Sequence, residues 1–135
     1  MYICGINNKN LNVMEEILFR AKRVDNGKLI YGSLIRSFEA FHISDDYFKP
    51  SNGEHPILID IDDDTISQFT GVTDRNETKV FENDTVLVHE NICGEIKDWT
   101  AKVAFKGGSF CLVTEEDYPI CSLFEVCGTF EVIPE

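Results

Sequence analysis

Basic residues are scarce in this 135-residue chain, which holds 12 Lys and Arg against 24 Asp and Glu, for a formal net charge of −12. The deficit of basic residues lies in residues 51–135. Residues 1–50 carry seven basic and six acidic side chains, and residues 51–135 carry five and eighteen, giving +1 and −13. Binding to nucleic-acid phosphates needs Lys and Arg to displace counterions, so direct nucleic-acid binding is not expected. An anionic membrane surface is excluded as a partner for the same reason.

Long apolar runs and secretion signals are also missing. No apolar run is long enough to span a bilayer, and the first residues lack the charged and apolar regions of a signal peptide. The cysteines form an odd set without any C-x-x-C pair, which fits reduced and mostly buried thiols better than a disulfide framework. They are Cys4, Cys93, Cys111, Cys121 and Cys127. We therefore expect a cytoplasmic protein without disulfides.

A calcium-binding loop is begun but not completed. Asp60, Asp62 and Asp64 alternate in the way that the first carboxylates of such a loop do. The later positions fail, because Thr65 stands where the loop needs glycine and Gly71 stands where it needs a bidentate glutamate. We interpret this segment as a solvated acidic turn.

Residues that serve zinc binding or nucleophilic catalysis are present but scattered. The histidines stand singly, at His42, His55 and His89. Cys111, Cys121 and Cys127 could meet in a barrel, where a core containing thiols is the favoured interpretation over a metal site. No Ser or Cys stands in a G-x-S-x-G or comparable context. We predict no catalytic residue, no cofactor and no metal, and hence a protein that is not an enzyme.

Turn residues are frequent and helical periodicity is scarce, which favours a mainly β fold. Asp25-Asn26-Gly27-Lys28 is the strongest turn, because Asn and Gly tolerate the positive φ angles of a tight hairpin. The strands predicted in this part cover residues 17–23, 28–33 and 36–43. Residues 45–54, which contain Pro50, are predicted to form a loop. Residues 13–19 fit either a short helix or the approach to the first strand.

The second part of the chain repeats this pattern of short strands. Predicted strands cover residues 57–61, 65–70, 80–81, 85–89, 101–105, 110–113 and 123–132. Gly107-Gly108 is predicted to turn one strand into the next, and Gly128 is predicted to mark a bulge or bend in the last strand. Strands of this length and spacing suggest a small barrel or sandwich.

Four segments in order carry a more specific pattern: Phe19-Arg20-Ala21, residues 28–32, residues 65–74 and residues 80–86. Together they resemble the YopX-like family of bacteriophage and prophage proteins, from about residue 14 to residue 134. The matching positions are Phe19, Arg20, Ala21, Gln68, Phe69, Thr70, Gly71, Asp74 and Asp84. The resemblance implies a mainly β protein of a bacterial host's cytoplasm. It also implies an N-terminal extension (1–13), a β-rich part (14–64) and a C-terminal SH3-like small barrel (65–135). No reaction is implied.

The chain departs from the family pattern at three positions where the family has glycine. Ser67, Glu77 and Asn83 stand there instead. Asn83 is a mild replacement, because asparagine tolerates the left-handed conformation. Glu77 is less suited to a positive φ, so we expect either another turn geometry or Asn76 in the left-handed position.

These observations favour a protein that acts through contacts with other proteins or with itself. Tyr47 and Phe48 stand in a predicted loop beside Pro50, and we predict a protein contact there. Trp99 precedes a predicted strand, where it serves either as a plug of the barrel mouth or as a binding platform. Homo-oligomerisation is expected from the contrast between the near-neutral first part and the acidic second part. The alternative is an acidic mimic of DNA that inhibits a host DNA-binding protein through residues 60–64 and 115–117.

Overall fold

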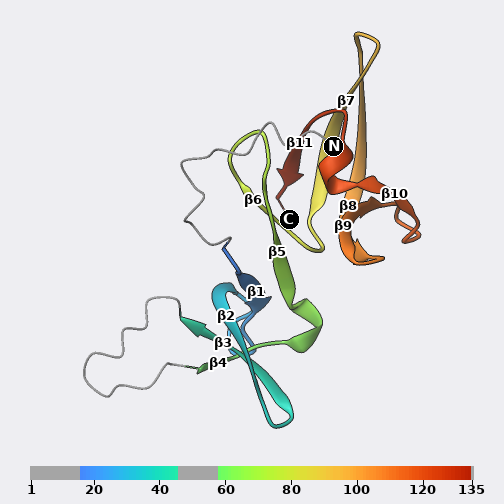
Figure 1. Ribbon diagram of the computed structural model, residues 1–135. Helices are drawn as coiled ribbons and strands as arrows, with labels where there is room; N and C mark the ends of the chain where they lie inside the picture. Colours follow the sequence, from blue (N-terminus) through green and yellow to red (C-terminus); the bar gives the residue numbers. More distant parts are fainter. Residues whose placement is uncertain (1–15, 46–57, 135) are drawn as a thin grey trace.

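The computed structural model describes residues 16–45 and 58–134, and these residues form a mainly β protein, as predicted (Figure 1). The strands are β1 Phe19–Lys22, β2 Leu29–Ser37, β3 Ala40–Asp45, β4 Leu58–Asp60, β5 Ser67–Thr73, β6 Lys79–Phe81, β7 Thr85–Ile92, β8 Glu95–Lys106, β9 Ser109–Val113, β10 Pro119–Ser122 and β11 Gly128–Ile133. Two short 3-10 helices are η2 Asp63–Thr65 and η3 Leu123–Glu125. Among the described residues, no helix is long and apolar enough to cross a membrane.

The first sheet has six strands in the order β4-β3-β2-β1-β5-β6, and its neighbouring strands are antiparallel. The predicted turn at residues 25–28 joins β1 to β2. There Gly27 has φ 69°, and the Lys28 N–H donates to Asn26 Oδ1 at 2.9 Å. Ala21, Ile43 and Ile61 form the buried centre of this sheet. The hairpin prediction is therefore confirmed in place and in mechanism.

The prediction of one strand over residues 36–43 is wrong. The chain reverses at Phe38 and Glu39, and the pairing of Ser37 with Ala40 closes a two-residue hairpin turn between β2 and β3. Phe38 has φ 50° and a relative exposure of 101%. Its aromatic side chain suggested strand propensity, but closure of the hairpin decides the local conformation.

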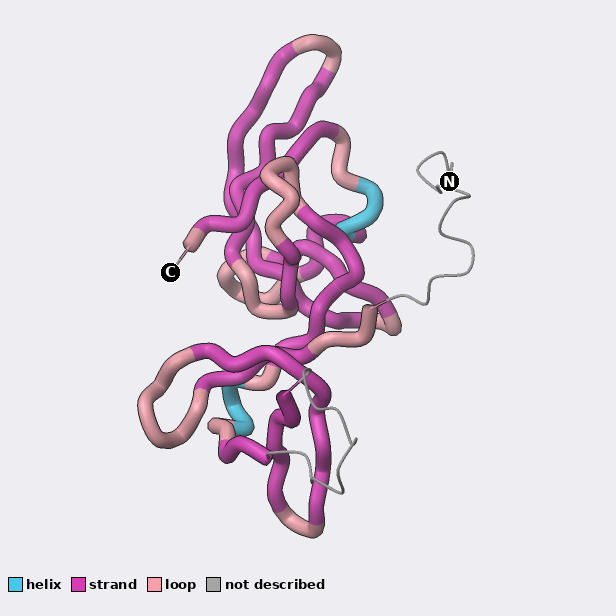
Figure 2. Tube along the Cα trace, turned by 90° about the vertical axis from the view of Figure 1, so that its left-hand side faces the viewer, coloured by secondary structure: helices cyan, strands magenta, loops and turns pink. Residues whose placement is uncertain are grey.

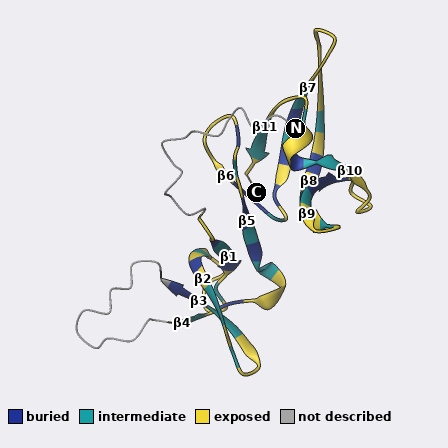
Figure 3. Cartoon of the chain, viewed as in Figure 1, coloured by how far each residue is buried: buried dark blue, intermediate teal, exposed yellow. Residues whose placement is uncertain are grey.

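The second sheet has five strands in the order β10-β9-β8-β7-β11, all antiparallel. Its hairpin of β7 and β8 extends well beyond the other strands, and its exposed tip is visible at the top of Figure 3. Gly107 and Gly108 turn β8 into β9, as predicted. The largest core cluster lies against this sheet and contains Val80, Val86, Val88, Ala101, Val103, Leu112 and Leu123.

A single strand over residues 123–132 is not observed. Leu123 is buried at the start of η3, where the Ser122 hydroxyl accepts the Phe124 N–H, and β11 begins only at Gly128. Gly128 has φ 126°, and a Cβ there would lie 2.1 Å from the His89 carbonyl oxygen. The predicted bend at Gly128 is thus the start of the strand, because only glycine fits so close to β7.

Strand β5 links the two sheets. Phe69 on β5 packs with Leu18 and Phe81, whereas Val72 on the same strand packs against the large cluster of the second sheet. Figure 1 shows β5 between the two parts of the molecule, and Figure 2 shows these parts meeting at a narrow middle region. Strands β10 and β11 are the two edges of the second sheet, so no ladder of hydrogen bonds closes it into a barrel. The division of the chain at residue 64 stays a prediction. The first sheet includes strands from both sides of that residue.

Candidate functional site

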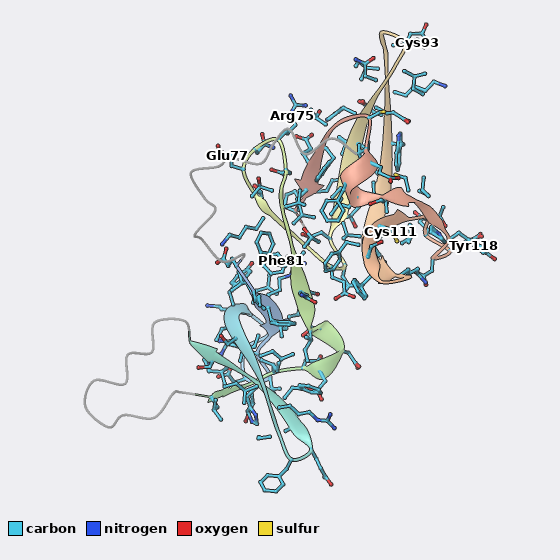
Figure 4. All side chains as sticks on the ribbon, in the orientation of Figure 1. Arg75, Glu77, Phe81, Cys93, Cys111 and Tyr118 are labelled. Carbon is cyan, nitrogen blue, oxygen red and sulfur yellow. The ribbon has the colours of Figure 1, made fainter. Side chains whose placement is uncertain are left out.

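The junction between the two sheets is organised by an ion pair between β1 and the turn before β7. Arg20 Nη2 donates to Asp84 Oδ1 at 2.5 Å, and the side chains are only 15% and 9% exposed. Asp84 Oδ2 also accepts the Phe81 N–H at 2.8 Å. The Arg20 guanidinium lies 4.6 Å from the centre of the Phe81 ring, which Figure 4 labels at this junction. Arg20 therefore ties β1 to the turn before β7 by charge, and to β6 of its own sheet by a cation–π contact.

Two of the three departures from the family pattern meet beside this ion pair. Asn83 has φ 72°, as its replacement of glycine predicts, and its Nδ2 donates to Ser67 Oγ at 3.1 Å. Ser67 is 3% exposed. The exposed Asn83 thus supplies the hydrogen bond that the buried Ser67 hydroxyl needs, which explains how both replacements fit together.

A cavity of about 580 Å³ opens at this junction. Its lining includes the cations Arg20, Lys22 and Lys102 and the carboxylates of Asp64 and Asp84. The charges are nearly balanced, and Arg20 and Asp84 already bind each other. Ser67, the buried hydroxyl of the lining, is held by Asn83 and has no histidine beside it in the lining. The cavity thus offers a polar groove rather than an activated nucleophile.

Asp74 ties the β5–β6 turn to the last strand. Its Oδ1 accepts the N–H groups of Asn76 at 2.8 Å and Thr78 at 2.9 Å, and its Oδ2 accepts the Val132 N–H at 2.8 Å. Burial raises the pKa of Asp74, but the three backbone N–H groups outweigh burial and hold the pKa below its ordinary value. A carboxylate thereby links β11 to the β5–β6 hairpin where no strand ladder does.

The other family-motif residues also serve the structure. Phe19 and Ala21 lie on β1, where Phe19 pairs with Gln68, and Ala21 is fully buried. The Thr70 hydroxyl donates to the Val80 carbonyl oxygen at 2.8 Å and accepts the Val72 N–H at 3.2 Å. Gly71 has φ 86°, at the irregular part of the β5–β6 pairing.

The residues predicted to make protein contacts fall in different places. Tyr47 and Phe48 lie outside the described residues, as does the predicted extension over residues 1–13. Trp99 lies inside β8 rather than before a strand. It is half-buried against the core of the second sheet, and its Nε1 donates to Glu90 Oε2 at 2.9 Å.

Glu77 itself takes the positive φ at the β5–β6 turn, with φ 65°, so Asn76 in the left-handed position, one of the two expected alternatives, is not observed. Figure 4 shows Glu77 at this exposed turn. Replacing Glu77 by Gly is expected to raise the free energy of unfolding by about 0.5–1 kcal/mol, because glycine adopts this conformation without steric cost. Urea denaturation measures the change. Replacing Glu77 by Ala is the control, and a gain of the same size there would contradict the explanation by φ.

His89 lies on β7 between two carboxylates. Its Nδ1 is 2.8 Å from Asp98 Oδ1 and its Nε2 is 3.4 Å from Glu131 Oε1. The hydrogen bond with Asp98 has the largest effect and raises the pKa of His89 above its ordinary value. Desolvation, the next largest effect, lowers the pKa, and the hydrogen bond with Glu131 raises it again.

We expect the interaction of His89 with Asp98 and Glu131 to make the free energy of unfolding depend on pH. A raised folded pKa means that the stabilisation is complete below about pH 6.5 and is lost as the pH rises through the folded value. The urea midpoint of the wild type should therefore fall in that window, and that of His89→Gln should fall less. An NMR titration of the imidazole gives the folded pKa directly, and an ordinary value would contradict this prediction.

Asp60, Asp62 and Asp64 resemble the start of a calcium-binding loop, but the side chains of Asp60 and Asp62 make separate structural contacts. Asp60 Oδ1 pairs with His42 Nε2 at 3.1 Å, and the Asp62 side chain caps η2 by accepting the Asp64 N–H. Within residues 16–45 and 58–134, no three His, Cys, Asp or Glu side chains are placed to hold a metal ion.

Burial raises the pKa of the Cys121 thiol, and the negative charges of Glu90 and Glu125 raise it further.

Two features escaped the sequence analysis. The first is the aromatic tip at Phe38, in a turn without Gly, Asn or Asp at its centre. The second is the pair of cavities beside β1, whose walls come from segments distant in the sequence. Composition carries no signal for either, because both depend on strand pairing.

The fold and these contacts define a mainly β protein of two linked antiparallel sheets with a charged junction. The family described as YopX protein matches residues 18–134, and the chain belongs to this family. No curated protein and no solved structure matches the chain.

Proposed function

We propose that this protein is a non-enzymatic accessory protein of a phage or prophage, in the cytoplasm of a bacterial host, and that it acts through protein contacts, including contacts with itself. The observation that carries the proposal is Phe38. A side chain of this size stands entirely in solvent, on a backbone with positive φ that bulky residues avoid. Burial of such an aromatic against a partner recovers the hydrophobic free energy that the isolated chain forgoes.

The use of the polar side chains supports the same proposal. In the described part of the chain, every buried side-chain nitrogen and oxygen has a hydrogen-bond partner. The most buried charges, Asp74, Asp84 and Arg20, are committed to holding strands together. The most exposed large apolar side chain of the described residues, in contrast, is Phe38, at the tip of the β2–β3 hairpin. Apolar surface of this kind is what protein partners bury.

We also assign strands β5 to β11 to an SH3-like small barrel. Its support is the shared core, to which β6, β7, β8 and β9 each contribute buried residues and against which β5 and β11 pack. Helix η3 leads into β11. Asp74 then links β11 to the β5–β6 turn by a hydrogen bond, at a place where no strand pairing connects them. Amide exchange tests this assignment, because the Val132 N–H should be as protected as the ladder amides of β7.

Capture of partners from a bacterial host tests the functional proposal. Immobilised wild type and Phe38→Asn are exposed to lysate that also contains tagged free copies of the wild type. The expected result is capture of a protein, another copy included, by the wild type and a strong loss of capture by Phe38→Asn. Ile96→Ser is the control, since it removes an exposed isoleucine from the other hairpin. Equal capture by wild type and Phe38→Asn would contradict the proposal.

One observation favours the acidic DNA mimic as a second candidate. Glu115, Glu116 and Asp117 are exposed next to Tyr118, which is 65% exposed and stands at the rim of the molecule in Figure 4. Such a mimic should capture host DNA-binding proteins in a way that salt weakens. Glu115→Gln with Glu116→Gln should reduce that capture. Salt-insensitive capture would exclude this candidate.

A further inference from the structure

The tip of the β2–β3 hairpin forms an apolar knob. Phe38 is the first of the two turn residues, and its neighbours in the chain, Ser37 and Glu39, are polar. Asparagine or glycine would fit φ 50° with less strain, so the position keeps a bulky aromatic against the preference of its own backbone. A residue that is both strained and fully exposed indicates a contact that the isolated chain lacks.

A cavity of about 920 Å³ begins one residue further along the same hairpin. Its apolar lining includes Val24, Ala40, Phe41 and Ile61, and Val24 is 67% exposed although it is aliphatic. The cavity exists because the bridge between Arg23 and Ile61 brings the end of β1 beside the segment after β4. An aromatic ring, which buries about 150–250 Å² of surface, is of the size that such a cavity accepts.

The knob and the cavity are close neighbours on one sheet, and this allows a two-fold symmetric pairing between two copies. If Phe38 of one copy enters the cavity of a second, a two-fold rotation places the second Phe38 beside the first cavity. The contact is then isologous, buries both knobs at once and closes as a dimer. A cavity remote from the knob would instead lead to open chains of molecules.

The charges around the two features are complementary. The cavity lining is net acidic, because its carboxylates outnumber its cations Lys22 and Arg23, and Arg23 already pairs with Asp25. The carboxylates are Glu39, Asp60, Asp62, Asp63 and Asp64. Arg36 stands two residues before the knob, is exposed, and stacks over the Phe41 ring at 5.8 Å. It forms no ion pair within the described residues, so its charge is available to the acidic lining of a second copy.

We propose that a second copy of this chain is the partner of the β2–β3 hairpin, with Phe38 of each copy seated in the cavity formed by Val24, Ala40, Phe41 and Ile61 of the other. This inference rests on the proposed function and names the partner that the exposed aromatic binds. Arg36 steers the pairing toward the carboxylates at residues 62–64 and fixes its register.

Sedimentation velocity over a wide range of protein concentration tests the pairing. The wild type is expected to form a dimer, and Phe38→Asn is expected to weaken it roughly 1,000-fold, because one substitution removes two central aromatic anchors. Asparagine suits a positive φ, so circular dichroism and urea denaturation should show a monomer at least as stable as before. Ile96→Ser should leave the dimer unchanged. A dimer that persists in Phe38→Asn overturns the proposal.

A charge exchange gives a second, independent readout. Arg36→Glu and Asp63→Lys are each expected to weaken the dimer about tenfold, because each places like charges together twice in the symmetric contact. The double variant restores opposite charges and should recover the wild-type dimer. Asp63 is suitable because its side chain, unlike that of Asp62, does not cap η2. Additive loss in the double variant would exclude the proposed register.

Photo-crosslinking separates this inference from the broader function. Benzoylphenylalanine at position 38, mixed with isotope-labelled wild type, is expected to crosslink residues 24, 40 or 41 of the labelled copy. If the protein stays monomeric while Phe38-dependent capture of a host protein persists, the pairing is overturned and the proposed function stands. If neither a dimer nor a captured protein is found, both are overturned.

Discussion

Asp74→Asn is expected to lower the free energy of unfolding by about 3 kcal/mol, which makes it one of the most damaging conservative substitutions in the chain. The amide can keep its oxygen toward Asn76 and Thr78, but its NH2 group then faces the Val132 N–H, whose present acceptor is Asp74 Oδ2 at 2.8 Å. One buried donor is left unsatisfied and the charge that strengthens the other two bonds is lost. Urea denaturation, followed by the fluorescence of Trp99, the sole tryptophan, measures the loss.

The same carboxylate is expected to shape acid unfolding. The folded pKa of Asp74 lies below its unfolded value near 3.8, so its stabilisation is complete above about pH 4 and disappears as the pH falls through the folded pKa. Asp74→Asn lacks this component, and its stability should therefore depend less on pH as the pH falls below about 4. Asp63→Asn is the matched control, because Asp63 is exposed in η2. Equal losses in the two variants would contradict the role given to Asp74.

Local turn chemistry made part of this fold predictable. Asn26 and Gly27 mark a hairpin because one supplies a side-chain acceptor and the other a positive φ, and the structure uses both. The turn at Phe38 carries no such residue, so Phe38 and Phe41 among polar residues predict a continuous strand that the structure does not form. The start of β11 was also missed, because Gly128 is required by the close approach of the His89 carbonyl, a contact across the sheet.

The candidate site was predictable only as separate pieces. Arg20 and Asp84 were singled out by their family motifs, but they are 64 residues apart, and no local pattern states that they pair. The hydrogen bond between Asn83 and Ser67 is of the same kind, since each residue was recognised as a departure without its partner. The cavity beside Phe38 depends on the bridge of Arg23 with Ile61, which only the assembled sheet creates. Long-range pairing thus decides the site, while short-range chemistry decides the turns.

Arg20→Met is expected to destabilise the protein by about 3–5 kcal/mol, the largest effect that we predict for a single side chain. Methionine retains much of the packing on Phe81 but removes the cation at 2.5 Å from Asp84 Oδ1. The Asp84 carboxylate is 9% exposed. Among the described residues, it then keeps only the Phe81 N–H as a hydrogen-bond donor. Breaking a buried pair in this way leaves an uncompensated charge, which costs more than the intact pair contributes.

A double-mutant cycle separates the ion pair from its surroundings. Arg20→Met with Asp84→Asn should cost less than the sum of the single substitutions, by about 1–3 kcal/mol, because no charge is left buried alone. The exposed pair of Arg23 with Asp25, 34% and 63% exposed, is the control, and Arg23→Met should leave the urea midpoint nearly unchanged. Additive effects at Arg20 and Asp84 would mean that the two sheets are held together by the apolar contacts of Val72 and Val80 with the core of the second sheet instead.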